Sequence, residues 1–214
     1  MVEAREIDYN RIILAFLIAT LFFSIGILLG YIVRMTLQEN TITLQDKLKN
    51  DILDFETISL MQITYPCNAL ILDRSSEKLD SIGSMITVLE SKKGKYDSVI
   101  LELKKSYSIL ELRHFLLIKD RNEKCSNNYT AILYFYSNTK ECKDSVDKVS
   151  FILSYLRNKE SNIRVYSFDM NLDSDIISIF KKEYGIDGCY GVVLDGKKIP
   201  GLIRDSSYIE QFIK

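Results

Sequence analysis

A run of 22 uncharged, mostly apolar residues, Ile12–Val33, constrains this chain more than any other feature of its sequence. At about 1.5 Å per residue, a helix of that length spans roughly 33 Å, enough to cross the hydrocarbon core of a bilayer. Arg11 and Arg34 bracket the run. We therefore predict a short N-terminal tail over residues 1–11 and a single transmembrane helix over residues 12–33, in contact with membrane lipid.

A cleavable signal peptide is the alternative, but its apolar region would be only about 7–15 residues long, followed by a cleavage site between small residues. This run is longer, and Arg34 follows it without such a site, so we favour a permanent anchor. Basic residues nearly balance on the two sides, so the positive-inside rule does not decide the orientation. We place the N-terminus in the cytoplasm and the C-terminal part outside, because disulfides persist only in oxidising compartments. This orientation depends on the cysteines being paired.

Two glycines inside the run, Gly26 and Gly30, form a GxxxG pattern, and Ala15 and Ala19 repeat the four-residue spacing. Small residues at that spacing let two transmembrane helices approach closely, so a homodimer contact through Gly26 and Gly30 is one interpretation. The other is chance in an apolar run that contains alanine and glycine, and we favour it.

The four cysteines of this chain of 214 residues, Cys67, Cys125, Cys142 and Cys189, include no close CxxC pair. A structural zinc site usually draws on such closely spaced ligands, and there is one histidine, so we expect no metal site and no cofactor. The net charge of −1 argues against a nucleic-acid partner, because phosphate binding needs a basic surface. Four cysteines allow three pairings, among which sequence alone does not choose.

Residues 35–120 show no strand pattern and are predicted to form about three helices. Apolar residues recur there at spacings of three and four, as typical of helices with one apolar face. Pro66 is expected to separate the first helix from the second, and residues 92–95 (KKGK) the second from the third. The apolar faces must be buried, either against one another or against the C-terminal domain.

Two features of this helical region invite a functional or structural role. His114 lies on the apolar stripe of the third helix without a nucleophile nearby in sequence, so we interpret it as a partly buried structural histidine. Cys67 and Cys125 flank the second and third helices. A helical hairpin brings its two ends together, so these cysteines are a candidate disulfide that would stabilise the fold by about 4 kcal/mol in the chain-entropy model.

The hydrophobic period changes after Cys125. Residues 131–136 (AILYFY) form a short continuous apolar run, which is typical of a buried central strand. The following segments predict a helix opening at Cys142, a strand over 163–170, a helix over 176–184, a hairpin with strands at 191–194 and 197–203, and a last short helix. This βαβαββα order predicts a mixed four-stranded sheet in the order 2-1-3-4, with helices on both faces.

This order, with a cysteine opening the first helix, resembles the thioredoxin fold over residues 128–214. Three segments carry the likeness: residues 132–137 (ILYFYS), residues 142–145 (CKDS) at the family's CxxC position, and residues 184–191 (YGIDGCYG), similar to its YGIxGxPT segment. The resemblance implies an α/β thioredoxin-like C-terminal domain, preceded by a helical region and one transmembrane helix.

The sequence departs from the family in both halves of its dithiol site. Ser145 replaces the second cysteine of CxxC, and Tyr190 stands at the family's cis-proline position. A non-proline cis bond costs about 2.5–4 kcal/mol, so we predict a trans bond and a differently shaped loop. At a helix start beside Lys140 and Lys143, the thiolate of Cys142 is still favoured, as in a monothiol redox protein. The alternative, which the helical spacing supports, is a vestigial or structural cysteine.

By the same resemblance, Cys189 precedes the lost proline position and faces Cys142. The pair is then a disulfide, an unusual redox pair or a two-ligand fragment of a metal site. Two functions follow: a non-catalytic, membrane-tethered binding or scaffold module for extracytoplasmic protein partners, or a thiol–disulfide oxidoreductase that uses Cys142 alone or with Cys189. The changes at Ser145 and Tyr190 favour the binding module slightly.

Overall fold

The computed structural model describes residues 9–125 and 129–213, apart from the side chains of Arg11, Gln45 and residues 34–42. Most of the predicted N-terminal tail, residues 1–8, therefore lies outside the described residues. The described chain is a mixed α/β protein with six α-helices, one short 3-10 helix and a four-stranded sheet. It divides into two compact units, residues 1–47 and residues 48–214.

Helix α1, Tyr9–Thr64, contains the apolar run and continues well past it. Its span Ile12–Val33 is long and apolar enough to cross a membrane, with a mean hydropathy of 2.9 and no buried residue. The hydroxyl of Ser24 donates to the carbonyl of Thr20 at 2.8 Å, as expected of a serine in an apolar helix. A methyl group added at Gly26 or Gly30 would meet no described atom within 4 Å, so the homodimer contact stays a prediction.

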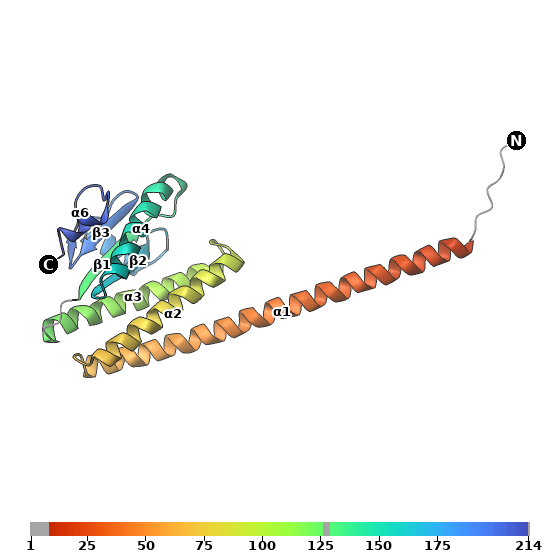
Figure 1. Ribbon diagram of the computed structural model, residues 1–214, viewed down its shortest axis with the longest axis horizontal. Helices are drawn as coiled ribbons and strands as arrows, with labels where there is room; N and C mark the ends of the chain where they lie inside the picture. The colour runs from red at the N-terminus through yellow and green to blue at the C-terminus, as the bar shows by residue number, and fades with distance from the viewer. Residues whose placement is uncertain (1–8, 126–128, 214) are drawn as a thin grey trace. The chain divides into compact units, whose positions relative to one another are not determined.

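The helical part of the second unit follows the predicted division. Helix α1 ends at Thr64 before Pro66, α2 spans Ala69–Lys93, and α3 spans Ser98–Cys125, beyond the predicted limit at residue 120. The side-chain oxygen of Asn68 accepts the backbone N–H of Leu70 at 3.0 Å and so caps α2. The helices α2 and α3 run side by side as a hairpin (Figure 1).

Apolar side chains and one ion-paired lysine hold the end of α1 against this hairpin. The fully buried side chains include Leu48, Phe55, Leu72, Ile82, Leu89, Ile100 and Ile118. At the margin of this core, Lys78 of α2 bridges two carboxylates of α1, Asp51 at 2.7 Å and Asp54 at 2.9 Å. The predicted apolar faces are thus buried against one another, and also against the sheet.

The sheet has the order β2-β1-β3-β4, as predicted. Its central strand β1 (Thr130–Tyr136) pairs in parallel with β2 (Ile163–Asp169) and antiparallel with β3 (Tyr190–Leu194). Strand β4 is only Lys197–Lys198, whereas the sequence predicted a strand to residue 203. The pairing stops where Pro200 lacks a backbone N–H and Gly201 adopts φ +76°.

Helices cover both faces of the sheet. On one face, Ile132 and Tyr134 of β1 belong to an apolar cluster with α4 (Lys143–Lys159) and with Ile209 of α6 (Ser206–Glu210). On the opposite face, Phe115 of α3 meets the ring of Tyr166, with ring centroids 6.0 Å apart. Helix α5 (Asp175–Glu183) begins after Ser174, whose side chain makes no capping hydrogen bond.

The only histidine joins three elements in this core. His114 of α3 is 1% exposed, with Nε2 3.1 Å from Ser76 Oγ of α2 and Nδ1 2.8 Å from the Tyr166 hydroxyl of β2. The Ser76 hydroxyl donates to the carbonyl of Leu72, so Ser76 Oγ accepts from Nε2–H and the Tyr166 hydroxyl donates to Nδ1. Burial, with Arg164 nearby, lowers the pKa of His114 to about 3. It is therefore a neutral structural residue, buried more deeply than predicted.

This histidine generates a prediction about acid stability. Between about pH 6.5 and pH 3 the unfolded chain binds a proton on His114 that the folded chain does not, so stability falls as the pH falls through that window. The test measures the free energy of unfolding by denaturant in micelles at pH 6.5, 5.5 and 4.5. As the pH falls, we expect this free energy to decrease less steeply in the His114→Gln variant than in the parent, by up to about 1.4 kcal/mol per pH unit. Parallel profiles for the two proteins would contradict the assignment.

Candidate functional site

The structure brings Cys142 and Cys189 together, as the resemblance implied. Their sulfurs are bonded at 2.00 Å and their Cα atoms lie 5.1 Å apart, across 47 positions of sequence. The bond joins the N-cap of α4 to the loop that leads into β3. Because the sulfurs bind each other, they are not metal ligands here, and no group of three or more ligating residues gathers elsewhere among the described residues.

A buried carboxylate forms hydrogen bonds to the chain segment between β1 and Cys142. Asp169, at the end of β2, accepts the side-chain amide of Asn138 and the backbone N–H of Asn171, the latter at 3.0 Å. The side-chain oxygen of Asn171 in turn accepts the backbone N–H of Asn138 at 2.6 Å. These bonds tie together the ends of the two parallel strands, from which the 3-10 helix η1 (Lys140–Cys142) starts.

The loop before β3 is held against the same segment. The backbone N–H of Ser137 donates to the carbonyl of Cys189 at 2.9 Å. The peptide bond before Tyr190 is trans, as predicted, since the described residues contain no cis bond. The Tyr190 hydroxyl accepts the backbone N–H of Ile203 at 3.2 Å. Tyr190, which stands at the cis-proline position of the thioredoxin pattern, therefore fixes the chain that follows β4.

Ser145, which stands where the CxxC motif has its second cysteine, forms a hydrogen bond to the backbone. Its hydroxyl donates to the carbonyl of Cys142 at 2.8 Å, a contact within the first turn of α4. Nearby, the Tyr134 hydroxyl donates to the carbonyl of Val146 at 3.0 Å, and burial raises the pKa of Tyr134 to about 12. Both hydroxyls thus fix the start of α4, where Cys142 lies.

The second cysteine pair is also bonded. Cys67 and Cys125 have their sulfurs 2.02 Å apart and their Cα atoms 5.4 Å apart, so the disulfide joins the start of α2 to the end of α3. Arg121 donates to the carbonyl of Pro66 at 2.5 Å beside it. All four cysteines are paired.

Comparison with models of protein families, with curated proteins and with solved structures finds no match to this chain. The functional interpretation therefore depends on side-chain geometry, including that of a residue which the sequence analysis missed. Glu111 of α3 is 4% exposed, yet it carries an ionisable group. It follows Tyr107 by four positions and precedes His114 by three. A glutamate on the predicted apolar face of this helix was the signal in the sequence that could have identified it.

The two disulfides generate a comparative prediction. They close loops of similar length, with separations of 47 and 58 residues, so the chain-entropy model assigns about 4 kcal/mol to each. We expect the Cys142→Ser/Cys189→Ser and Cys67→Ser/Cys125→Ser double variants to lose similar unfolding free energy, measured by denaturant in micelles. As a control, Ser145→Ala should lose about 1 kcal/mol or less. A loss below about 1 kcal/mol for the first double variant would contradict a stapling role for that bond.

Proposed function

We propose that the chain is a membrane-tethered, thioredoxin-like module that binds or scaffolds extracytoplasmic proteins without redox turnover. Residues 12–33 form the anchor in this proposal, the N-terminus is cytoplasmic, and residues 48–214 lie outside. The pairing of all four cysteines supports an oxidising compartment. The strand order and the cysteine at the start of α4 support the thioredoxin-like assignment.

The observation that carries the non-catalytic interpretation is that the cysteine pair is bonded, with Cys142 buried and Cys189 partly buried. Cys142 is 8% exposed and belongs to the apolar cluster under α4, with Cys189 packed against it. A thiol can attack a disulfide only where it can reach a sulfur. In addition, Ser145 has no thiol, and its hydroxyl is committed to the carbonyl of Cys142. We infer that this bond holds α4 to β3 and thereby shapes a binding surface.

A thiol–disulfide oxidoreductase is the second candidate, and one observation favours it. Cys142 stands at the N-cap of α4 and has a bonded partner, Cys189. In the reduced protein, the Cys142 thiolate would attack a substrate disulfide, forming a mixed disulfide and releasing one substrate thiolate. Cys189 would then attack the Cys142 sulfur, releasing the second substrate thiolate and restoring the disulfide. Two electrons would pass from the protein dithiol to the substrate.

Redox equilibration separates the two candidates. We expect the Cys142–Cys189 bond of the natively folded full chain to stay oxidised in glutathione buffers, as structural disulfides with potentials below about −300 mV do. The experiment uses the Cys67→Ser/Cys125→Ser variant, in which Cys142 and Cys189 are the remaining cysteines. After acid quenching, the mass added by a maleimide reagent measures how much of this pair is reduced. Full reduction near −200 mV, together with reduction of a protein disulfide substrate, would instead establish the oxidoreductase.

The orientation is tested on intact cells that express the chain with an epitope at its C-terminus. Protease added outside should remove the epitope, because residues 48–214 are expected on the extracytoplasmic side. Carbonate extraction should leave the protein in the membrane fraction if residues 12–33 anchor it. An epitope that is cleaved only after the membrane is permeabilised would reverse the proposed orientation, and release by carbonate would contradict the anchor.

A further inference from the structure

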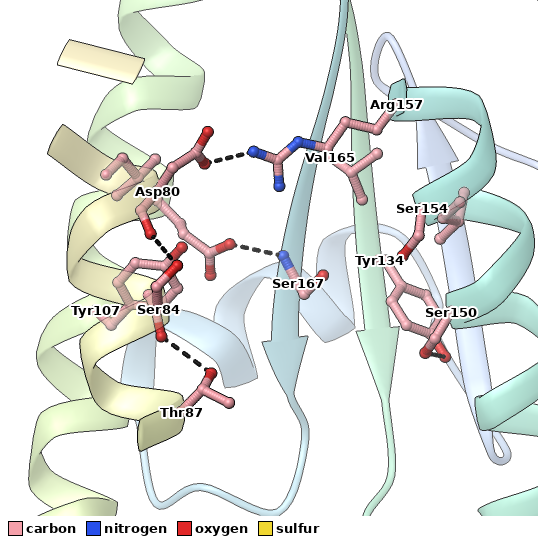
Figure 2. A pocket seen from close by; sticks show the side chains of 14 residues that line it. Asp80, Ser84, Thr87, Tyr107, Tyr134, Ser150, Ser154, Arg157, Val165 and Ser167 are labelled. Atoms are coloured by element: carbon pink, nitrogen blue, oxygen red, sulfur yellow. Dashed lines mark hydrogen bonds and ion pairs between the residues drawn. The ribbon is translucent and has the colours of Figure 1, made fainter. Parts of the chain in front are cut away.

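A polar cleft of about 410 Å³ lies in the second unit, and no cysteine lines it. Helices α2 and α3 form one wall, α4 forms the other, and β2 runs between them (Figure 2). Asp80, Ser84 and Thr87 line the α2 side, and Ser150, Ser154 and Arg157 line the α4 side (Figure 2).

Glu111 of α3 lines this cleft with an incompletely satisfied carboxyl group. One oxygen, Oε1, accepts the backbone N–H of Ser167 at 2.9 Å. The other, Oε2, is buried without a hydrogen-bond partner among the described residues. A buried polar atom that lacks a partner costs about 1–3 kcal/mol, so it indicates a group that is satisfied by something bound.

Three of the hydroxyl groups that line the cleft use their hydrogens inside the protein, and so offer acceptors to a ligand. Ser84 donates to the carbonyl of Asp80 at 2.9 Å, and Thr87 donates to the carbonyl of Gly83 at 3.0 Å. Ser150 donates to the Tyr134 hydroxyl at 3.3 Å. Each of these oxygens keeps lone pairs for a ligand while its hydrogen is used inside the protein.

The cation that lines the cleft already has a partner. Arg157 of α4 forms an ion pair with Asp80 of α2 at 2.5 Å. This pair is about half-exposed and nearly neutral as a unit, so the acceptors around Glu111 set the local chemistry. The complement to a set of acceptors around one carboxyl group is a compact positive donor, and an ammonium group has three donors and no acceptor.

We propose that this cleft binds a primary ammonium group, with Glu111 Oε2 as its principal acceptor and the hydroxyl oxygens of Ser84, Thr87 and Ser150 as further acceptors. The group belongs either to a free small amine or to a lysine side chain. This site is independent of the anchor and of the cysteine pair.

Proton linkage follows from this assignment. Burial raises the pKa of Glu111 to about 8, with Asp80 of α2 adding to the rise and Arg157 of α4 opposing it. The other titratable groups near it are four buried or partly buried tyrosines, Tyr107 of α3, Tyr134 and Tyr136 of β1 and Tyr166 of β2. Burial raises the pKa of each, so these phenols stay neutral. Below pH 8, ammonium binding must therefore expel the Glu111 proton. Affinity rises with pH up to about 8 and falls again only where the amine itself deprotonates, near pH 10.

The test uses calorimetry on the full chain in micelles, with n-butylamine and 1,4-diaminobutane as probes and 1-butanol as the neutral control. Both amines should bind, and the apparent Kd should be roughly tenfold lower at pH 8.5 than at pH 7.0. Titrations in two buffers of different ionisation enthalpy should show roughly one proton released per bound amine at pH 7.0. At pH 8.5 the release should be well below half a proton per amine, because Glu111 is then mostly ionised. The absence of binding heat at pH 8.5, or equal binding of 1-butanol, would overturn the proposal.

Variants assign the site. Glu111→Gln, of the same size, should weaken binding at least tenfold and abolish the proton release. As the control, Glu102→Gln removes an exposed carboxylate of the same helix that does not line the cleft, and it should change the Kd by about threefold or less. Since Ser84 is exposed, Ser84→Leu should fill the cleft and remove binding without unfolding the chain, and it serves if Glu111→Gln misfolds. Parent-like binding in either Glu111→Gln or Ser84→Leu would refute the site.

A third probe distinguishes the sources of the ammonium group. Nα-acetyl-lysine N-methylamide presents the same group on a peptide backbone. If it binds as tightly as n-butylamine, the occupant is a lysine side chain. If it fails while both amines bind, the occupant is a free small amine.

Discussion

The packing of α3 against β2 is the contact on which the rest of the C-terminal unit depends. β2 is an edge strand, and its alternate N–H groups point away from β1 and need partners outside the sheet. Glu111 accepts one of them, that of Ser167, and His114 bonds the Tyr166 hydroxyl one residue earlier. One turn of α3 thus covers the edge, buries an aromatic ring, and places a carboxyl group in the wall of the polar cleft.

The two disulfides act within this arrangement at separate places. Cys67–Cys125 closes the α2–α3 hairpin, at the start of α2 and the end of α3. Cys142–Cys189 joins the start of α4 to the start of β3. Because each bond restricts the unfolded chain, the two add to the stability that the apolar core provides. A surface held in this way is suited to binding, and the proposed scaffold function uses that rigidity.

Features that depend on residues close together in the sequence were predictable, whereas features that depend on distant segments were not. Helix ends at Pro66 and Gly94, the apolar strand at residues 131–136 and the Asp195-Gly196 turn depend on local backbone chemistry, and each was predicted. The length of β4 was wrong, because the pattern of apolar residues continued past Pro200 while the pairing could not. Glu111 was missed, because its burial depends on a strand 56 residues away.

By itself, the sequence determined the apolar span, the helical region, the order of helices and strands along the chain and the absence of a CxxC pair, since composition and short-range periodicity encode these features. Only the tertiary structure decided which cysteines bond, that His114 is neutral and buried, and that one carboxyl oxygen of Glu111 has no hydrogen-bond partner among the described residues. The physical reason is that bonding, desolvation and unmet hydrogen bonds depend on neighbours from distant segments. Periodicity reports which face of an element is buried, but not what it meets there.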